Sequence, residues 1–385
     1  MKKTKSETVF FAAGECLTPL GWTLEENIEN LKQNKSVITE IIDKNLAENP
    51  FYGAVLNKEK LTKKFENLSY QEEFSTLEKM ILLASENIKN NYSSVLKDKC
   101  GLIISSTKGN INALEKRDIP QYLLSNLAEK IGKNIGIKSQ PIVLSNACVS
   151  GIMAVSVAKR LIQSGVYNHF VVVGADLFSK FVFSGFQSFQ AVSKKPCKPY
   201  DKFRDGITLG EAAAVALITK DLEKIKDKTY FEIIGESSIN DANHISGPSR
   251  TGEGLFQSIE NAKKEAEISA NEIDCISSHG TATLYNDEME AQAFTRAQLQ
   301  EKPVFSLKGR FGHTLGAAGL LESIITLKFA EENIIPPSFN YEKHGLTLPL
   351  NITKSFEEKE VNIILKTASG FGGSNTAVLF KKHSK

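Results

Sequence analysis

A chain of 385 residues, 41% of them hydrophobic, can bury a large core, which excludes a disordered or fibrous protein. The 47 Lys and Arg residues and the 45 Asp and Glu residues leave a formal charge of +2, with no long block of one sign. Composition therefore gives no indication of nucleic acid or an anionic membrane as a partner, and an acidic partner would have to be met by a local patch.

The cysteines and the apolar runs indicate the compartment. Five cysteines occur without a close pair, which argues against a disulfide framework and against a zinc cluster. The apolar stretch near the N-terminus is too short for a signal sequence and soon meets Glu15, and no other run approaches the roughly 20 apolar residues that span a bilayer. We therefore expect a soluble protein of the reducing cytoplasm.

In chain order, residues 24–33 and 75–91 have the apolar spacing of helices, and the Lys- and Asn-rich text between them is typical of solvated surface. Buried-strand patterns, some of them leading into a helix, then recur in the same order in both halves of the chain. The first-half segments are 100–110, 141–165, 169–178 and 212–219. The second-half segments are 273–294, 304–330, 361–373 and 376–380. This repetition predicts two related halves.

Strands that alternate with helices favour an α/β fold with a mostly parallel sheet covered on both faces. Two such halves packed together would place helices on the outside and between the sheets. No Pro- or Ser-rich linker separates them, so we expect close packing of a first half over residues 1–250 and a second over 251–385. In this fold class, chemistry collects where strands end in loops.

Cys148 is the first candidate for chemistry. It follows the apolar strand text PIVLSNA and precedes a helix rich in small and apolar residues. A sulfur at a helix N-terminus meets the positive end of the helix dipole, which favours the reactive thiolate. The alternative is a small buried hydrophobe, which is the usual role of an isolated Cys and the one that the contexts of the other four cysteines favour.

His279 and His313 stand at corresponding strand ends in the second half. Their neutral imidazoles could donate hydrogen bonds from Nε2 to a thioester carbonyl or an enolate, or one of them could act as a base. Taken singly, each also fits a surface or satisfied core histidine. Neither HxxxH spacing nor a nearby cysteine supports a metal site, and we expect none.

Lys308 ends a strand five residues before His313, where it is either a solvated cation or a fixed positive charge in a buried site. Asp287 and Glu290 lie in the helix that follows His279. Either carboxylate could belong to a solvated helix face, but Glu290 could also pair with Lys308 and hold it in place.

Two glycine-rich stretches follow, and neither fits a nucleotide site. HTLGAAGLL at 313–321 and SGFGGSN at 369–375 both lack the dinucleotide-binding and P-loop patterns. Close packing of backbone on backbone explains the first. The second flanks Phe371 with glycines, so it is either a strand turn or a mobile loop that presents a backbone N–H as half of an oxyanion hole.

With Cys148, His279, Lys308, His313 and Phe371 in this order, the sequence resembles the elongating β-ketoacyl-acyl-carrier-protein synthases, condensing enzymes of the thiolase superfamily. The resemblance covers nearly the whole chain, and its motifs are specific in their order and spacing. They are LTPLGWTLEENIENLKQNKSVI, SNACVSG, KPYDKFRDGITLGEAAAVAL, SSHGTATLYNDEMEAQA, SLKGRFGHTLGAAGLLESI and SGFGGSN. The resemblance implies a thiolase-like fold whose two pseudo-symmetric halves pack as five layers, αβαβα.

The resemblance also implies a decarboxylative Claisen condensation without a metal or nucleotide cofactor. Cys148 would accept an acyl chain from the phosphopantetheine of an acyl carrier protein, with the backbone N–H groups of Cys148 and Phe371 holding the oxyanion. His279 and His313 would then bind the malonyl thioester carbonyl, and Lys308, held by Glu290, would support the histidines.

Other positions are assigned by the same resemblance. Thr281 and Thr283 match positions that contact the phosphopantetheine arm, and Phe371 matches a gate between the cysteine and the entrance. Two positions depart from the family pattern: Ser369 stands where Phe is usual beside the gate, and Lys108 stands where a small or apolar residue usually lines the acyl pocket. A cation there would suit a short, polar or unusual chain, unless it turns to solvent or to a partner.

The stretch from Lys108 to Pro141 is shorter than the family usually has, in a region that contributes to the dimer interface. The resemblance implies a homodimer, or a heterodimer with a related subunit, that acts in fatty-acid synthesis or in specialised polyene or polyketide synthesis. Two alternatives stay open. One is a non-catalytic chain-length-factor-like subunit, against which Cys148 counts. The other is a thiolase-fold acyltransferase, which would not need two histidines.

Overall fold

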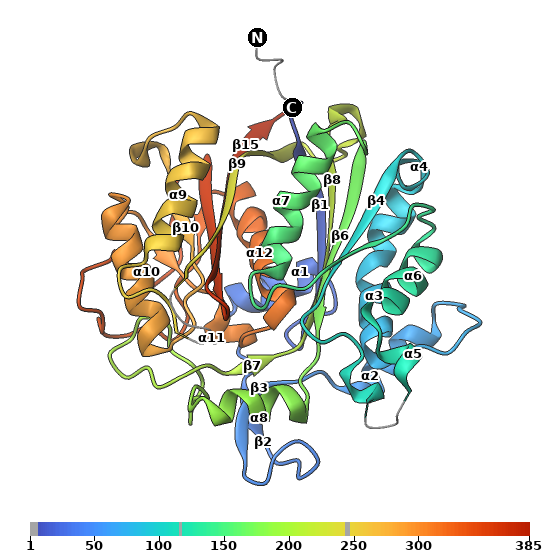
Figure 1. Ribbon diagram of the computed structural model, residues 1–385, viewed down its shortest axis with the longest axis horizontal. Helices are drawn as coiled ribbons and strands as arrows, with labels where there is room; N and C mark the ends of the chain where they lie inside the picture. The colour runs from blue at the N-terminus through green and yellow to red at the C-terminus, as the bar shows by residue number, and fades with distance from the viewer. Residues whose placement is uncertain (1–6, 115–117, 243–246) are drawn as a thin grey trace.

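The computed structural model describes residues 7–114, 118–242 and 247–385, in which ten strands form two sets of five (Figure 1). The first set is β1 (Phe10–Leu17), β4 (Cys100–Ser105), β5 (Ile142–Leu144), β6 (His169–Asp176) and β8 (Ala212–Thr219). The second set is β9 (Thr229–Asn240), β10 (Cys275–Ser277), β11 (Val304–Phe305), β14 (Ile363–Gly370) and β15 (Ser374–Ser384). Short strands outside these sets are β2 (Thr39–Ile41), β3 (Phe51–Ala54), β7 (Leu209–Gly210), β12 (Ile334–Ile335) and β13 (Glu357–Glu358).

The two sets have the same strand order and the same pairing. In the first, β5, β4 and β6 are parallel, and β8 and β1 follow as antiparallel neighbours. In the second, β11, β10 and β14 are parallel, and β15 and β9 follow as antiparallel neighbours. The prediction of two related halves is therefore confirmed.

The two sets join where β1 pairs with β9, through Phe10 with Glu232 and Phe11 with Phe231. The second set of strands thus begins with β9 at Thr229, which lies before the predicted division at residue 250. The division itself stays a prediction, because the two sets are continuous through β1 and β9.

Helices complete five layers. The α-helices are α1 (Leu24–Lys32), α2 (Lys58–Glu66), α3 (Thr76–Asn91), α4 (Ser93–Leu96), α5 (Ile119–Tyr122), α6 (Leu124–Ile135), α7 (Ser150–Gln163), α8 (Lys180–Ser188), α9 (Glu253–Ala266), α10 (Leu284–Arg296), α11 (Lys308–Phe311) and α12 (Ala318–Glu331). In Figure 1, α7 and α12 lie between the two sets of strands and contact both, while α3 covers the outer face of the first set and α9 that of the second. The predicted thiolase-like αβαβα architecture is confirmed.

Burial on both sides explains the composition of the central elements. Every residue of β6 and of β8 is buried, as expected for strands covered on both faces. Nearly every residue of α12 is buried as well, because this helix is packed all round. Close approach of α7 and α12 needs glycine: a Cβ on Gly151 would lie 2.8 Å from the carbonyl oxygen of Gly316 and from the backbone nitrogen of Leu320. The backbone packing expected for the 313–321 stretch is confirmed.

All five cysteines are free thiols and buried. Within the three described ranges, no helix is both long enough and apolar enough to cross a membrane.

Candidate active site

Cys148 lies in the turn between β5 and α7, at the inner end of a cavity. Ala147, directly before it, has a φ of +45°, a left-handed conformation that few non-glycine residues adopt. The Ser150 hydroxyl stabilises this turn, because it donates to the carbonyl of Ala147 at 2.7 Å and accepts from the N–H of Asn146 at 2.8 Å. The strained turn, followed at once by a helix, aims the thiol away from the sheet and into the cavity.

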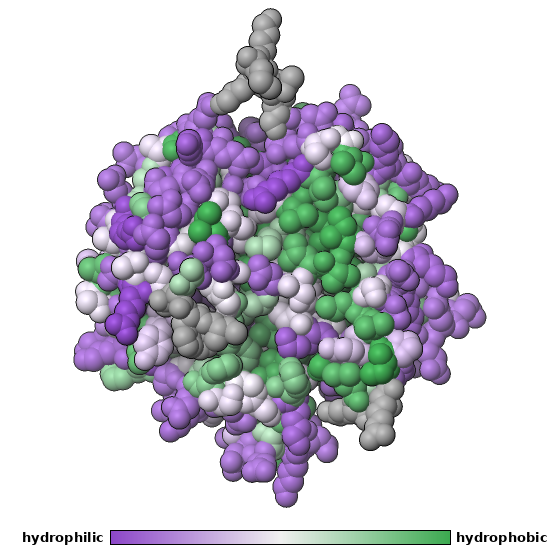
Figure 2. All heavy atoms as spheres, in the orientation of Figure 1, coloured by the Kyte–Doolittle hydropathy of each residue, from purple (hydrophilic) through white to green (hydrophobic). Residues whose placement is uncertain are grey.

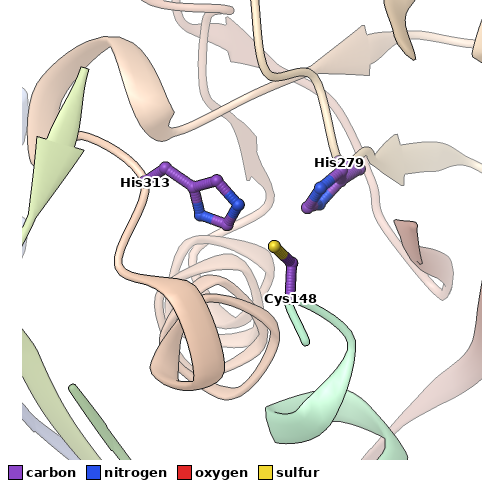
Figure 3. Close-up of side chains that lie close together, drawn as sticks. All are labelled: Cys148, His279 and His313. Atoms are coloured by element: carbon purple, nitrogen blue, oxygen red, sulfur yellow. The ribbon is translucent and has the colours of Figure 1, made fainter. Parts of the chain in front are cut away.

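Two histidines face this thiol (Figure 3). The rings of His279, just after β10, and His313, just after α11, lie 5.2 Å apart between centroids at an angle of 83°. One ligand atom from each ring and the Sγ of Cys148 all lie within 4.8 Å of one another. Residues separated by up to 165 positions in the chain thus converge, as the sequence analysis predicted.

Hydrogen bonds on the far side of each ring fix where its proton sits. The backbone N–H of Leu315 donates to Nδ1 of His313 at 3.2 Å. The ammonium of Lys308 lies 3.4 Å from Nδ1 of His279 and, having only protons to offer, can only donate to it. Since Nδ1 accepts in both rings, both neutral imidazoles carry their proton on Nε2.

Burial sets the charge states in the site. Burial, together with repulsion by the Lys308 ammonium, holds the pKa of both imidazoles well below its ordinary value, so both are neutral. Burial also raises the pKa of the Cys148 thiol to about 12, although the charge on Lys308 lowers it. The thiolate expected from the helix start is therefore not the resting form, because desolvation outweighs the helix N-terminus.

Lys308 is buried against the site, but its carboxylate partner is not the one predicted. Its Nζ donates to the His279 carbonyl at 2.5 Å and to Oε1 of Glu322 at 2.6 Å. Glu322 lies in the first turns of α12, a helix that packs against β10 and β14. The expectation that Glu290 holds Lys308 is wrong.

Glu290 instead holds the turn that carries His279. Its carboxylate accepts from the N–H groups of His279 and Gly280, both at 2.7 Å, and from the hydroxyl of Tyr200 at 2.9 Å. Asp287 stabilises the next residues of the same turn, because its carboxylate accepts a hydrogen bond from the N–H of Thr281 at 3.1 Å. Both carboxylates are buried and bound to the backbone, so neither forms a solvated helix face.

The sequence analysis missed Glu322 and a second buried cation, Lys366. The Nζ of Lys366 donates to the other carboxylate oxygen of Glu322 at 2.7 Å. A signal for both was present, since each is a lone charge in an otherwise uncharged segment, IILKTASG in β14 and AGLLESIITL in α12. A charge in such a place is rarely buried unless it is paired.

Phe371 lies between two cavities. The larger, about 390 Å³, is lined by Cys148, His279 and His313 together with Thr281 and Thr283. The smaller, about 160 Å³, also reaches Cys148 and is lined by Phe181 and Phe186 of α8. Phe371 borders both, and its ring, 38% exposed, contacts Phe186 and Phe189 at centroid distances of 5.5 and 5.4 Å. This placement agrees with a gate between an entrance and an acyl pocket.

Lys108 lines the smaller cavity, where its Nζ donates to the carbonyl of Thr107 at 3.1 Å. The shortened segment that follows Lys108 includes residues 115–117, which lie outside the described residues. Ser369 is buried and donates to Oδ1 of Asn375 at 2.7 Å, so the position where the family usually has Phe takes part in a polar contact.

The oxyanion donors expected at Cys148 and Phe371 have neighbouring backbones. A Cβ on Gly370 would lie 3.2 Å from the backbone nitrogen of Cys148, so the start of the 370–373 turn touches the start of α7. The two threonines of the entrance also lie together, with 2.9 Å between the hydroxyl oxygens of Thr281 and Thr283. The roles of these residues toward substrate stay predictions.

Comparison with known proteins agrees with this geometry. Residues 7–224 match the family model of the β-ketoacyl synthase N-terminal domain, and residues 230–342 match that of the C-terminal domain. The 3-oxoacyl-[acyl-carrier-protein] synthase 2 of Vibrio harveyi is 31% identical over 69% of this chain and 67% of its own. The enzyme of the same name from Synechocystis sp. is 26% identical over 95% of this chain and 96% of its own.

Solved structures with the same fold include ketosynthase complexes. One chain of the complex between the ketosynthase ApeO and its chain length factor ApeC, from Xenorhabdus doucetiae, has a TM-score of 0.85 at 23% identity. The match covers 97% of this chain and 98% of that chain. A chain of the ishigamide ketosynthase/chain length factor has a TM-score of 0.85 at 21% identity, with 98% and 99% covered.

Proposed function

This chain belongs to the β-ketoacyl synthase family, and we propose that it joins an acyl chain held on Cys148 to a malonyl unit delivered by acyl carrier protein. It is a condensing acyltransferase of fatty-acid or polyketide synthesis. One observation carries the assignment to these residues: the thiol of Cys148 faces two neutral imidazoles, His279 and His313, whose Nδ1 atoms are both occupied.

The first step transfers the acyl chain. The sulfur of Cys148 attacks the thioester carbonyl of acyl carrier protein, and the backbone N–H groups of Cys148 and Phe371 stabilise the oxyanion. The carbon–sulfur bond to the carrier breaks, and the thiol proton of Cys148 ends on the released pantetheine sulfur. Because the thiol is protonated at rest, this step begins from a neutral nucleophile.

The second step forms the carbon–carbon bond. The Nε2–H groups of His279 and His313 donate to the carbonyl oxygen of the malonyl thioester, carbon dioxide leaves, and the remaining electron pair forms an enolate. The enolate carbon attacks the acyl carbonyl on Cys148. The β-ketoacyl product leaves on the carrier, and the released thiolate takes up a proton from water. The positive charge of Lys308 favours each negative intermediate, and the proposed steps require neither a metal nor a nucleotide cofactor.

The larger cavity is the entrance for the carrier arm. Its mouth has the hydroxyls of Thr281 and Thr283 and the exposed guanidinium of Arg250, groups that suit the amides and phosphate of a phosphopantetheine. Exposed Tyr285, at the same mouth, offers an apolar contact for the carrier protein.

A second subunit covers an apolar face. Figure 2 shows hydrophobic side chains gathered on the face where α7 and β6 lie in Figure 1. Partly exposed apolar residues of this region include Val143 on the edge strand β5 and Met153 and Val157 on α7. An open strand edge beside apolar surface favours a partner of the same fold, either a second copy or a chain-length-factor-like subunit.

The acyl substrate is unusual, on the evidence of Lys108 at the smaller cavity. A cation in an acyl pocket disfavours a long saturated chain, which supports specialised polyene or polyketide synthesis over ordinary elongation. Cys148 argues against a non-catalytic role for this chain, and the histidine pair argues against acyl transfer alone.

Intact mass of the purified protein tests the function. The protein is incubated with a panel of acyl carrier proteins that carry different chains, and then with malonyl carrier protein. We expect one acyl chain per protomer on Cys148, lost again when malonyl carrier protein is added and recovered as an extended chain on the carrier. If Cys148 is loaded but the chain is not extended, the protein is an acyltransferase and not a condensing enzyme. If no chain is loaded, the proposal is contradicted.

A further inference from the structure

Lys366 is a buried cation that the condensing mechanism does not yet use. It lies in the middle of β14, with 1% of its surface exposed, opposite Ser277 of β10. Its Nζ lies 2.7 Å from Oε2 of Glu322 and between 2.9 and 3.2 Å from the carbonyl oxygens of Ser277, Ser278 and Thr367. Four oxygen atoms thus surround one ammonium.

Glu322 connects this ammonium to the reacting groups. Its Oε2 accepts from Lys366, and its Oε1 accepts from Lys308 at 2.6 Å. Lys308 in turn donates to the carbonyl oxygen of His279 and to Nδ1 of the same residue. A continuous path of polar contacts therefore runs from Lys366 through Glu322 and Lys308 to a ring that faces Cys148.

A purely structural role would not require a charge. The strands β10 and β14 are already joined by their backbone pairing, and an apolar side chain at position 366 would avoid the cost of burying an ammonium. With Lys366 present, one carboxylate is shared by two cations. Among the described residues, the charged groups that lower the pKa of the imidazoles are Lys308 and Lys366, and the carboxylate of Glu290 binds the backbone of His279. Lys308, Asp176, Lys108 and Glu322 act on the pKa of the facing thiol of Cys148.

We propose that Lys366 is a positioning residue for the condensation, whose ammonium holds Glu322 so that Lys308 stays on His279 and keeps that ring an Nε2–H donor. This role rests on the proposed function. The charge of Lys366 also lowers the pKa of both imidazoles, in the same direction as burial and Lys308, and so helps to keep them neutral.

Kinetics of two variants test the proposal. Lys366→Met keeps the length of the side chain and removes its charge. We expect its kcat for carbon dioxide release from malonyl carrier protein to fall about 10- to 100-fold, the effect of losing one charge-assisted hydrogen bond, with KM and the loading of Cys148 nearly unchanged. Lys366→Ser leaves space among the same oxygens, so ammonium chloride should restore part of its activity and sodium chloride at equal ionic strength should not.

Lys159→Met is the matched control, because Lys159 is also buried and paired with one carboxylate, Glu265, yet contacts none of the groups above. It should lower the melting temperature without changing kcat. If Lys366→Met and Lys159→Met behave alike, or if ammonium and sodium act equally on Lys366→Ser, the role of Lys366 is structural and the proposal is wrong.

A readout without substrate separates this proposal from the function itself. In ¹⁵N NMR of the imidazoles, the wild type should show His279 and His313 still neutral and protonated on Nε2 at pH values where a free imidazole, with a pKa of about 6.5, takes up a proton. Loss of the Lys366 charge should raise the pKa of an imidazole, so that in Lys366→Ser it begins to titrate at higher pH and ammonium reverses the change. If the wild type releases no carbon dioxide, the function fails while these spectra still decide the role of Lys366. Identical spectra in Lys366→Ser and in the wild type would overturn the proposed role of Lys366.

Discussion

Leu315 donates its backbone N–H to Nδ1 of His313 at 3.2 Å, and this hydrogen bond decides what the histidine can do. Leu315 itself has a φ of +54°, a conformation that a leucine rarely adopts without support from its surroundings. With Nδ1 occupied, His313 offers an N–H toward Cys148 and has no free lone pair with which to take the thiol proton. This geometry supports the proposed role of His313 as a hydrogen-bond donor to the substrate oxygen and not as a general base.

Replacement of His279 or His313 by Ala should therefore separate the two half-reactions. Both rings stabilise charge that develops only on the malonyl thioester, so each change should lower carbon dioxide release by about 10² to 10³ while some loading of Cys148 continues. Labelled carbon dioxide and intact mass follow the two steps in the same samples. Wild-type rates of release in both variants would contradict the mechanism.

The neutral histidines should also make stability depend on pH. The pKa of each histidine in the folded protein lies below its value of about 6.5 in the unfolded chain. Near and below pH 6.5 the unfolded chain therefore binds more protons at these residues than the folded protein does. The free energy of unfolding should then fall as the pH drops below about 6.5, by up to about 1.4 kcal/mol per pH unit for each histidine. Urea unfolding at several pH values measures this slope.

The control for that slope is His313→Gln, which lacks one of the two titrating groups. It should lose less stability than the wild type between about pH 6.5 and pH 5. Parallel curves for the two proteins would mean that His313 is not held neutral by the fold.

Much of this site was predictable because its residues stand at strand ends. Cys148 and His279 each follow an apolar strand, and His313 follows the short helix α11 that comes after β11. The repetition of the two halves brings these strand ends and their loops together. The partner of Lys308 was not predictable in this way. Glu290 is closer in the chain to His279, but its carboxylate accepts from two backbone N–H groups and from the Tyr200 hydroxyl. Only the tertiary packing of α12 brings Glu322 to Lys308.

Cys148 should be the first cysteine to react with limiting iodoacetamide. It lines a cavity, whereas the other four cysteines are buried in the packed interior. Because burial raises the pKa of its thiol to about 12, the rate should keep rising with pH above pH 9, as the thiolate fraction grows. Peptide mapping identifies the site, and earlier labelling of Cys100, Cys197 or Cys275 would refute the assignment.

Lys108→Ile should change chain preference if the ammonium limits the acyl pocket. Removal of the charge from the smaller cavity should speed the loading of long saturated chains relative to short ones. Loading rates across chain lengths measure this, with the oligomeric mass determined in parallel. Weaker assembly with unchanged preference would place Lys108 at a subunit interface instead, and no change in either property would remove the support for an unusual substrate.

The central claim is that acyl-Cys148 is consumed by a decarboxylated malonyl unit. A single turnover tests it most directly: protein loaded with one acyl chain on Cys148 is mixed with carrier protein whose malonyl carboxylate is labelled, and carbon dioxide and acyl-enzyme are counted over time. The account predicts one carbon dioxide released for each acyl chain lost from Cys148, with an equal amount of β-ketoacyl carrier protein formed. Loss of the acyl chain to water or back to the carrier, without release of carbon dioxide, would contradict it.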